Sequence, residues 1–346
     1  MTRPHILVRG GAADVFTTWE TARRALKIPT ASTRFVYIGP NGLRWDLSGR
    51  FEGRQGARLS KEVQGAYHLP FEQLFTEGAY QIGATYERTN INKRIINIGV
   101  LLGYRADSQT KLSAEAYRMI ETNWWDSWPP DTPGWLGCHT PTGGWRWCQV
   151  QLAKTVDTSM VLDPTAFGNN GFLWDMQLVA AKPWWAKRTL FEQWTAHPAT
   201  TSLLGYDEKT FHIANRGTLA VWPKFIYTGP GRCWIQDGMS DTLLEMPTLT
   251  SDDGYVLVDT DPAERTFTSS TDPIDNIFYQ LIRQSKVLDF FLHDIAALGL
   301  PVWRRANGIR FQSQIPPRTV ANIKVRHDHA GGQVTCLIPQ RYSRPS

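Results

Sequence analysis

Short apolar stretches closed by turn residues dominate the middle of the chain. Residues 222–227 are rich in β-branched and aromatic side chains, as strands are. Asn215 readily adopts a turn conformation, and Gly229-Pro230-Gly231 reverses the chain. The stretch 211–267 is therefore predicted to be a run of short strands, and it contains no recognisable catalytic motif.

The same pattern continues on both sides of that stretch. Asn41-Gly42 is a strong turn signal, which predicts a hairpin with its two strands at 34–38 and 43–47. Further strands are predicted at 57–64, 78–86, 94–104, 145–152, 172–180, 255–258 and 322–326.

Three segments have helical periodicity instead. A short helix is predicted over 18–26, and Ser113 is a suitable N-cap for a second helix running toward Trp124. The longest helix is predicted over 272–299, where Asp272-Pro273 opens an apolar stripe that ends at Gly299. At 1.5 Å per residue, its ~26 residues would extend roughly 39 Å.

Two sets of strand and turn residues resemble one known family when they are taken in order. Residues 211–217, 221–231 and 254–262 are similar to the galectin-like part of siphophage distal tail proteins, also called minor tail proteins, especially those of phages with actinobacterial hosts. Upstream, four blocks are similar to the N-terminal β-sandwich, or belt domain, of the same family: 42–49, 55–59, 81–86 and 94–100. The resemblance rests on the order and joint occurrence of these blocks over roughly residues 35–268.

This resemblance implies a fold and a role. The expected fold class is mainly β, with two β-sandwich domains, a belt-like one and a galectin-like one, plus the long C-terminal helix. The expected role is structural and not enzymatic: a hexameric ring in the virion tail tip, joining the tail tube to the baseplate hub and receptor-binding apparatus. Its implied partners are further copies of itself, the tail tube, hub and tape measure proteins, and genomic DNA in transit.

Length and charge indicate how the chain is divided. At 346 residues it is too long for one ordinary core. Net charges of +7, −9 and +7 fall on residues 1–118, 119–303 and 304–346. The first predicted domain is a belt-like sandwich over 1–118, completed by the basic C-terminal strands over 304–346. A Trp/Pro-rich linker follows over 119–144, then a galectin-like sandwich over 145–271 and the long helix over 272–299.

Composition places the protein among folded chains made in a cytoplasm. Hydrophobic residues make up 42% and charged residues 20%. No apolar run approaches the ~18 residues of a membrane span, and the N-terminus lacks the apolar core of a secretion signal. We therefore expect synthesis in the host cytoplasm and no membrane insertion.

The four cysteines are predicted to be buried thiols. They are widely spaced and form no Cys-x-x-Cys motif. An alternative applies to one pair, because a hairpin centred near Gly143 would bring Cys138 and Cys148 onto neighbouring strands. A disulfide there requires that the two residues oppose each other closely.

The chain contains no Gly-x-x-x-x-Gly-Lys phosphate loop, no His-Glu-x-x-His zinc helix and no Gly-x-Ser-x-Gly nucleophile elbow. His327 and His329 would point to one face of a strand, as metal ligands require, but Gly331-Gly332 follows and favours a hairpin turn. Clustered carboxylates attract calcium, and four aspartates lie near one predicted strand: Asp252, Asp253, Asp259 and Asp261. We favour the interpretation that they occupy turns at the two ends of that strand. We predict no catalytic, cofactor-binding or metal-binding residue, and no cofactor.

Fifteen tryptophans raise a carbohydrate hypothesis, because aromatic rings stack on sugars. Trp124, Trp125 and Trp128 stand beside Asp126 and Asp131, a composition that glycosidases share. Buried tryptophans, or tryptophans at subunit contacts, account for the same residues and are favoured. A host-surface carbohydrate-binding module of the tail tip remains the alternative function.

The basic C-terminal segment leaves two interpretations open. Its cations could contact DNA phosphates or the carboxylates of another tail protein. Ile315-Pro-Pro317 interrupts the segment, so no base-reading helix is expected. The cations concerned are Arg304, Arg305, Arg310, Arg318, Lys324 and Arg326.

Overall fold

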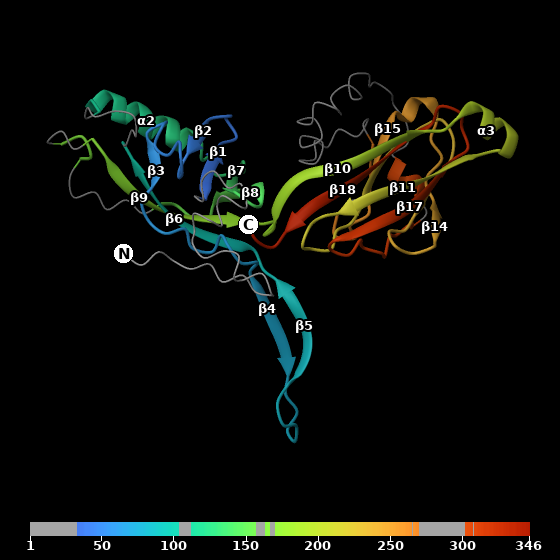
Figure 1. Cartoon of the computed structure of the whole chain (residues 1–346), viewed down its shortest axis with the longest axis horizontal. Coiled ribbons are helices and arrows are strands. Elements are labelled where there is room, and N and C mark those ends of the chain that lie inside the picture. Colours follow the sequence, from blue (N-terminus) through green and yellow to red (C-terminus); the bar gives the residue numbers. More distant parts are fainter. Residues whose placement is uncertain are drawn as a thin grey trace, which may run out of the picture. The chain divides into compact units, whose positions relative to one another are not determined.

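The computed structural model describes residues 33–103, 112–156, 163–166, 170–264, 266–269, 302–306 and 308–346. The chain divides into two compact units (Figure 1). Unit 1 comprises Met1–Lys187 with Tyr342–Ser346, and unit 2 comprises Arg188–Arg341. Within the described residues, no helix is long and apolar enough to cross a membrane. The predicted helices over 18–26 and 272–299 lie outside the described residues.

Unit 1 is built from antiparallel strands that pair in the order β2-β1-β7-β8-β9-β6-β3. Their bounds are β1 Arg34–Ile38, β2 Arg44–Asp46, β3 Ala57–Leu59, β6 Arg94–Leu102, β7 Gly134–Thr140, β8 Gly144–Leu152 and β9 Phe172–Ala180. Leu59 at the last strand donates its backbone N–H to the carbonyl of Leu47, just beyond β2, at 2.7 Å. The two ends of the strand order therefore meet.

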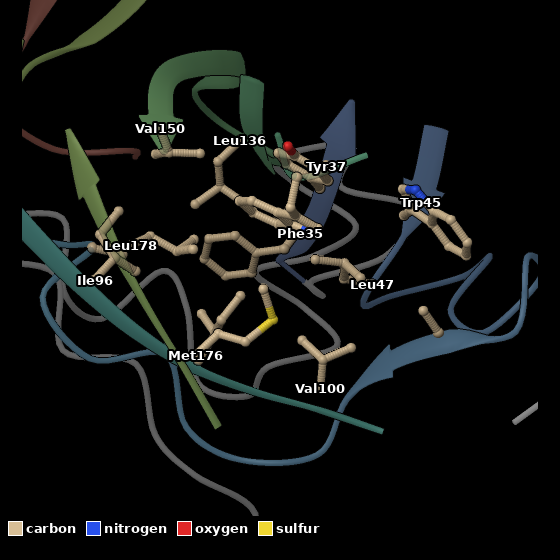
Figure 2. Close-up of a cluster of buried hydrophobic side chains, with 14 of the residues drawn as sticks. Phe35, Tyr37, Trp45, Leu47, Ile96, Val100, Leu136, Val150, Met176 and Leu178 are labelled. Atoms are coloured by element: carbon tan, nitrogen blue, oxygen red, sulfur yellow. The ribbon is translucent and has the colours of Figure 1, made fainter. Parts of the chain in front are cut away.

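Alternation along these strands produces the core of unit 1. Figure 2 shows Phe35 and Leu136 facing Ile96 and Met176 across the interior. Successive side chains point to opposite faces of a strand, so the even-numbered residues 94–102 of β6 and 174–180 of β9 are buried. The intervening residues of these two stretches are more exposed, except Gly99. The result is one cluster of buried apolar side chains for the whole unit.

Helix α2 (Ala114–Asp126) also belongs to unit 1 and confirms the predicted cap. Ser113 has an extended backbone, and its hydroxyl accepts a 3.1 Å hydrogen bond from the N–H of Ala116. This bond satisfies one of the free amides at the helix start. Tyr117 and Trp124 are the buried residues of the helix.

Unit 2 has two facing sheets and the short helix α3 (Pro198–Leu204). One sheet has the order β16-β15-β12-β18-β10, and the other β11-β17-β13-β14. Between them, apolar residues from both sheets form a second buried cluster. The bounds are β10 Trp185–Thr195, β11 Asp207–Asn215, β12 Lys224–Thr228, β13 Cys233–Gln236, β14 Leu243–Glu245, β15 Tyr255–Asp259, β16 Phe267–Ser269, β17 Thr319–His327 and β18 Gln333–Tyr342. Short 3-10 turns occupy Ser251–Asp253 and Val302–Arg305.

The boundary between the units differs from the predicted one at 118/119. It falls at 187/188. β7 pairs with β1, which places much of the supposed linker inside unit 1, and β9 pairs with β6, which places residues 172–180 there too. At the C-terminus only Tyr342–Ser346 returns to unit 1, where Arg146 donates hydrogen bonds to the carbonyl of Arg344 at 2.7 Å. The rest of the predicted returning segment, including β17, belongs to unit 2.

One predicted strand is largely a turn in the structure. Residues 78–86 were expected to be extended, but they contain the turn of a hairpin whose strands are β4 (Phe71–Thr76) and β5 (Thr85–Ile91). Gly83 has a φ of +85°, a left-handed conformation that suits glycine and turns the chain. The alternating apolar residues of this segment therefore lie on a loop.

Candidate functional site

The β4–β5 hairpin is a part of unit 1 whose large apolar side chains are not packed into the buried core. We call residues 70–92 the arm; in Figure 1 its two strands run away from the other strands of unit 1. β4 and β5 form a two-stranded sheet of their own, and their last backbone contact joins Asn92 N–H to the carbonyl of Pro70 at 3.1 Å. Each strand therefore has an outer edge without a strand partner among the described residues.

One face of the arm is apolar and exposed. Phe71 opposes Ile91, and Phe75 opposes Tyr86, so these four side chains lie on the same face. Their exposed fractions are between 52% and 60%. Phe75 and Tyr86 contact each other edge to face, with ring centroids 5.9 Å apart. Exposed apolar patches of this kind mark protein interaction sites.

A shift in strand register lies between Leu74 and Phe75. Leu74 pairs with Arg88 while Phe75 pairs with Tyr86, so Glu87 is the additional residue on β5. Such a bulge bends and twists a strand locally. Thr76 donates a 2.7 Å hydrogen bond to the Glu87 carboxylate, which holds the extra residue on the arm.

The tip of the arm carries two fully exposed apolar side chains, Tyr80 and Ile82. Glycines flank them at positions 78 and 83. Gln81, between them, donates a 2.8 Å hydrogen bond to the hydroxyl of Thr85. The polar side chain of Gln81 is therefore hydrogen-bonded within the loop, while the apolar side chains of Tyr80 and Ile82 are exposed to solvent.

Arg94 fixes the root of the arm. It is fully buried where β6 begins, and its guanidinium donates to the backbone carbonyls of Gly65, Ala66 and His68 at 2.7–2.9 Å. The carbonyl of Pro183 accepts a further bond at 2.7 Å. Burial lowers the pKa of Arg94, but these acceptors compensate the buried charge. The arm therefore projects from a rigid base.

The tryptophans that raised the carbohydrate hypothesis lie largely in the core. Trp124 and Trp128 are buried, and Trp128 stacks on Tyr37 with ring centroids 3.7 Å apart. Trp125 contacts Trp174 edge to face. Asp126 and Asp131 are exposed beside them. These rings fill the interior of unit 1 and offer no open platform for a sugar.

The predicted histidine pair falls at a turn, but not at a hairpin. His327 ends β17 and is buried, with Nε2 2.9 Å from the carbonyl of Thr228 and Nδ1 accepting from the N–H of His329. β17 and β18 belong to different sheets, so the turn crosses between sheets. Among the described residues, no group of three or more His, Cys, Asp and Glu side chains gathers as a metal site requires.

The predicted aspartates lie at the two ends of β15, where each one described has a partner. Asp253 accepts hydrogen bonds from Arg305 at 3.0 Å and from the N–H of Thr250 at 2.7 Å. Burial alone raises the pKa of the Asp253 carboxyl, but these bonds outweigh it and leave the pKa below its usual value. Asp259 forms a buried ion pair with Lys224, and the carboxylate of Asp261 accepts from the N–H of Ala263. The side chain of Asp252 lies outside the described part.

All four cysteines are free and buried. The hairpin around Gly143 exists, but Cys138 opposes Arg146 and Cys148 opposes Leu136. The two thiols are therefore two positions out of register, and the alternative of a disulfide is wrong.

The basic C-terminal residues are partly neutralised within unit 2. Arg326 forms an ion pair with Glu208 at 2.9 Å, and Arg305 pairs with Asp253. Arg310 and Arg318 are exposed. The side chain of Arg304 lies outside the described part, and Lys324 is half-buried.

Comparison with known proteins identifies relatives over most of the chain. No protein-family model matches. The chain is 23% identical to minor tail protein Gp27 of Mycobacterium phage D29, over 88% of this chain and 96% of that protein. It is 24% identical to minor tail protein Gp27 of Mycobacterium phage L5, over 81% and 87% of the two chains.

A solved structure shares the fold. The crystal structure of SPP1 Dit, described as a paradigm of the hub adsorption apparatus in phages infecting Gram-positive bacteria, matches with a TM-score of 0.50 and 11% identity. The match covers 89% of this chain and 99% of that one. The predicted resemblance to phage distal tail proteins is confirmed. The likeness extends to proteins named minor tail proteins, as that resemblance implied.

The arm itself was not predicted as a site. Sequence reasoning placed its tip in a strand of the belt domain. The available signal was the pair Gly78 and Gly83 around Tyr80 and Ile82, since glycines at that spacing indicate a loop and not a strand interior.

Proposed function

We propose that six copies of this protein form a ring at the tail tip, which connects the tail tube to the baseplate hub and receptor-binding apparatus around the DNA channel. Its partners in this role are the tail tube, hub and tape measure proteins, and genomic DNA passes through the ring. The observation that carries the proposal is the arm, whose apolar face is about half exposed in the single chain.

Keeping these apolar side chains in contact with water is unfavourable. Four aromatic or aliphatic side chains on one face of a two-stranded sheet gain free energy when another protein covers them. An isolated two-stranded hairpin is marginally stable in water, so an added surface also stabilises the arm. A neighbouring copy is the partner available at every position of a ring, and repeated head-to-tail contacts close such a ring.

We assign the belt-like sandwich to unit 1 and the galectin-like sandwich to unit 2. Support comes from the two buried clusters, one per unit. In unit 2, β12 and β15 on one sheet and β17 and β13 on the other supply core residues, as facing layers of a sandwich do.

The proposed role is structural, with no bond made or broken by the protein in another molecule. Trp124 and Trp128, beside Asp126 and Asp131, are packed into the core and serve the rigidity of unit 1. A protein that acts by shape needs rigid units and contact surfaces, and the arm is such a surface.

Electron microscopy of the purified protein tests the proposal. Rings with sixfold symmetry are expected for the natural sequence. A variant in which Phe71, Phe75, Tyr86 and Ile91 are all replaced by threonine should fold and remain monomeric. Leu43→Thr removes an exposed apolar side chain outside the arm; it is the matched control and should leave rings intact. Monomers at all concentrations of the natural protein would contradict the ring.

A further inference from the structure

Lys224 and Asp259 form a buried ion pair within unit 2. The two residues are direct cross-strand partners on β12 and β15. Their side chains are only 5% and 8% exposed, and the Lys224 ammonium contacts the Asp259 carboxylate. In the ion pair Arg305–Asp253, by comparison, the arginine side chain is 29% exposed. Water therefore has little access to either charge of the Lys224–Asp259 pair.

The surroundings of this pair are apolar. The residues next to the pair on both strands face the core between the two sheets, so Lys224 and Asp259 lie on the opposite face of their sheet. On that face Leu337 of β18 is the other cross-strand partner of Lys224, and Leu257 lies two positions before Asp259 on β15. Both leucines are buried. Two opposite charges in such a place lose their hydration, and their mutual attraction does not always offset that loss.

Hydrogen bonds of the backbone hold both groups in position. The Thr260 hydroxyl donates a 2.6 Å hydrogen bond to the carbonyl of Pro223, which ties together the residues adjacent to the pair. The N–H of Asp259 donates to the carbonyl of Thr266 at 2.8 Å. Oδ1 of Asp259 accepts from the N–H of Asp261 at 3.1 Å, and Oδ2 is the oxygen that contacts the ammonium. Two groups held in alignment react as if one of them were present at about 10⁵–10⁸ M.

We propose that Lys224 and Asp259 condense to an amide, an isopeptide bond that ties β12 to β15. Burial disfavours both charged forms, so a proton passes from the ammonium to Oδ2 along their contact. The neutral Nζ of Lys224 then attacks Cγ of Asp259. Negative charge that develops on Oδ1 is stabilised by the N–H of Asp261 and by the nearby cation of Arg341.

The atoms of this step balance without a co-reactant. The Nζ–Cγ bond forms and the Cγ–Oδ2 bond breaks. Oδ2 leaves as water, with the proton it received first and a second proton from the nitrogen. An ammonium and a carboxylate thus become one neutral amide and one water molecule, and the carbonyl oxygen of the amide keeps its hydrogen bond from Asp261. The interior of unit 2 then no longer holds this pair of charges.

The bond changes how unit 2 can open. Residues 224–259 become a closed loop, so β12 and β15 stay joined even when the surrounding hydrogen bonds break. The step happens once in each chain, acts on no other molecule and is independent of the proposed ring. Its expected effect is resistance of unit 2 to pulling and to protease.

The intact mass of the denatured protein tests the proposal directly. Natural protein, kept folded until its mass is constant, should be lighter than its sequence by one water molecule. Lys224→Arg is the matched control, because it keeps a cation beside Asp259 but its guanidinium stays protonated and is no nucleophile. This variant should have its full sequence mass. Natural protein with the full sequence mass would overturn the proposal, whether or not the variant folds.

Peptide mapping locates the lost water. Aspartates that precede glycine can also lose water, because the next backbone nitrogen attacks their side chain, and this chain has Asp237-Gly238 and Asp253-Gly254. Trypsin should give a branched peptide from the natural protein, in which residues 217–232, uncut after Lys224, are joined to residues 233–265. The Lys224→Arg variant should give the linear peptides. A water loss that maps to Asp237 or Asp253, with cleavage after Lys224, would overturn the proposal.

Discussion

Unit 1 contains two hairpins of similar local pattern and opposite surroundings. The β7–β8 hairpin is flanked by β1 and β9 and buries Leu136, Cys138 and Val150. Among the described residues no strand flanks the β4–β5 arm, which leaves Phe71 and Phe75 about half exposed. Both contain alternating apolar residues, but only one of them has a core to fill.

The difference separates two uses of apolar side chains. In the β7–β8 hairpin they contribute to the free energy of folding of the single chain. In the arm the apolar side chains contribute little to the free energy of folding, because about half of their surface stays in water. They become stabilising when another molecule covers them. The following predictions test this division, beginning with the largest expected change in stability.

Replacing Arg94 with alanine should have the largest effect, because this residue joins the arm to the core. It removes the donor that several buried carbonyls share, including those of Ala66 and Pro183. With a cost of about 1–3 kcal/mol for each buried group left without a partner, unfolding should become easier by about 4 kcal/mol or more. Urea denaturation measures this loss. Arg88→Ala on the arm is the control, and an equal loss there would contradict the division.

Leu136→Ala should cost about 3 kcal/mol, within the usual range for truncating a buried leucine. Leu136 is 1% exposed and lies in the middle of the unit 1 cluster. The midpoint of urea unfolding should fall without a change in slope. A loss below about 1 kcal/mol would mean that the β7–β8 hairpin is not the packed one.

Thiol labelling compares the hairpins without disturbing either. Burial raises the pKa of Cys138 and of Cys148 to about 12. At pH 8 the thiolate fraction is then about 10⁻⁴, roughly a thousandfold below that of an exposed cysteine, and burial blocks access as well. Native protein should therefore label only after unfolding, whereas the arm variant Gln73→Cys should label at once. Fast labelling of the natural protein would contradict the burial of the β7–β8 hairpin.

Phe75→Thr should have the smallest effect on the monomer, within about 0.5 kcal/mol. Among the described residues, chymotrypsin should cut the monomer near Tyr80 first, because exposed loop tips are the preferred sites of cleavage. A monomer destabilised by 2 kcal/mol or more would show that the arm packs against its own chain. Protection of Tyr80 in the monomer would lead to the same conclusion.

Much of the fold could be predicted from local patterns. The Asn41-Gly42 turn, the Ser113 cap and the strand over 172–180 are set by neighbouring residues, and all three occur in the structure. The boundary between the units could not be predicted, since it depends on β7 pairing with β1 about a hundred residues away. The cross-strand positions of Cys138 and Cys148 also depended on a register that spacing alone does not fix.

The candidate site could not be predicted from local sequence patterns, for a different reason. Apolar alternation at Tyr80 and Ile82 is the same signal that a core strand produces, and no sequence pattern states whether a second layer covers it. The tryptophans presented the reverse case, because Trp124 and Trp128 suggested an open platform and are packed in the core. Exposure is a property of the fold, so the interaction surface appears only when the strands are placed.

Oxidative footprinting of the arm in the assembled ring and in the monomer tests the central claim most directly. The method measures the solvent exposure of individual side chains, and Phe71, Phe75 and Tyr86 are each more than half exposed in the single chain. We predict that their oxidation slows at least tenfold on assembly, while that of the exposed Met119 stays constant. Equal oxidation of the three rings in ring and monomer would contradict the account.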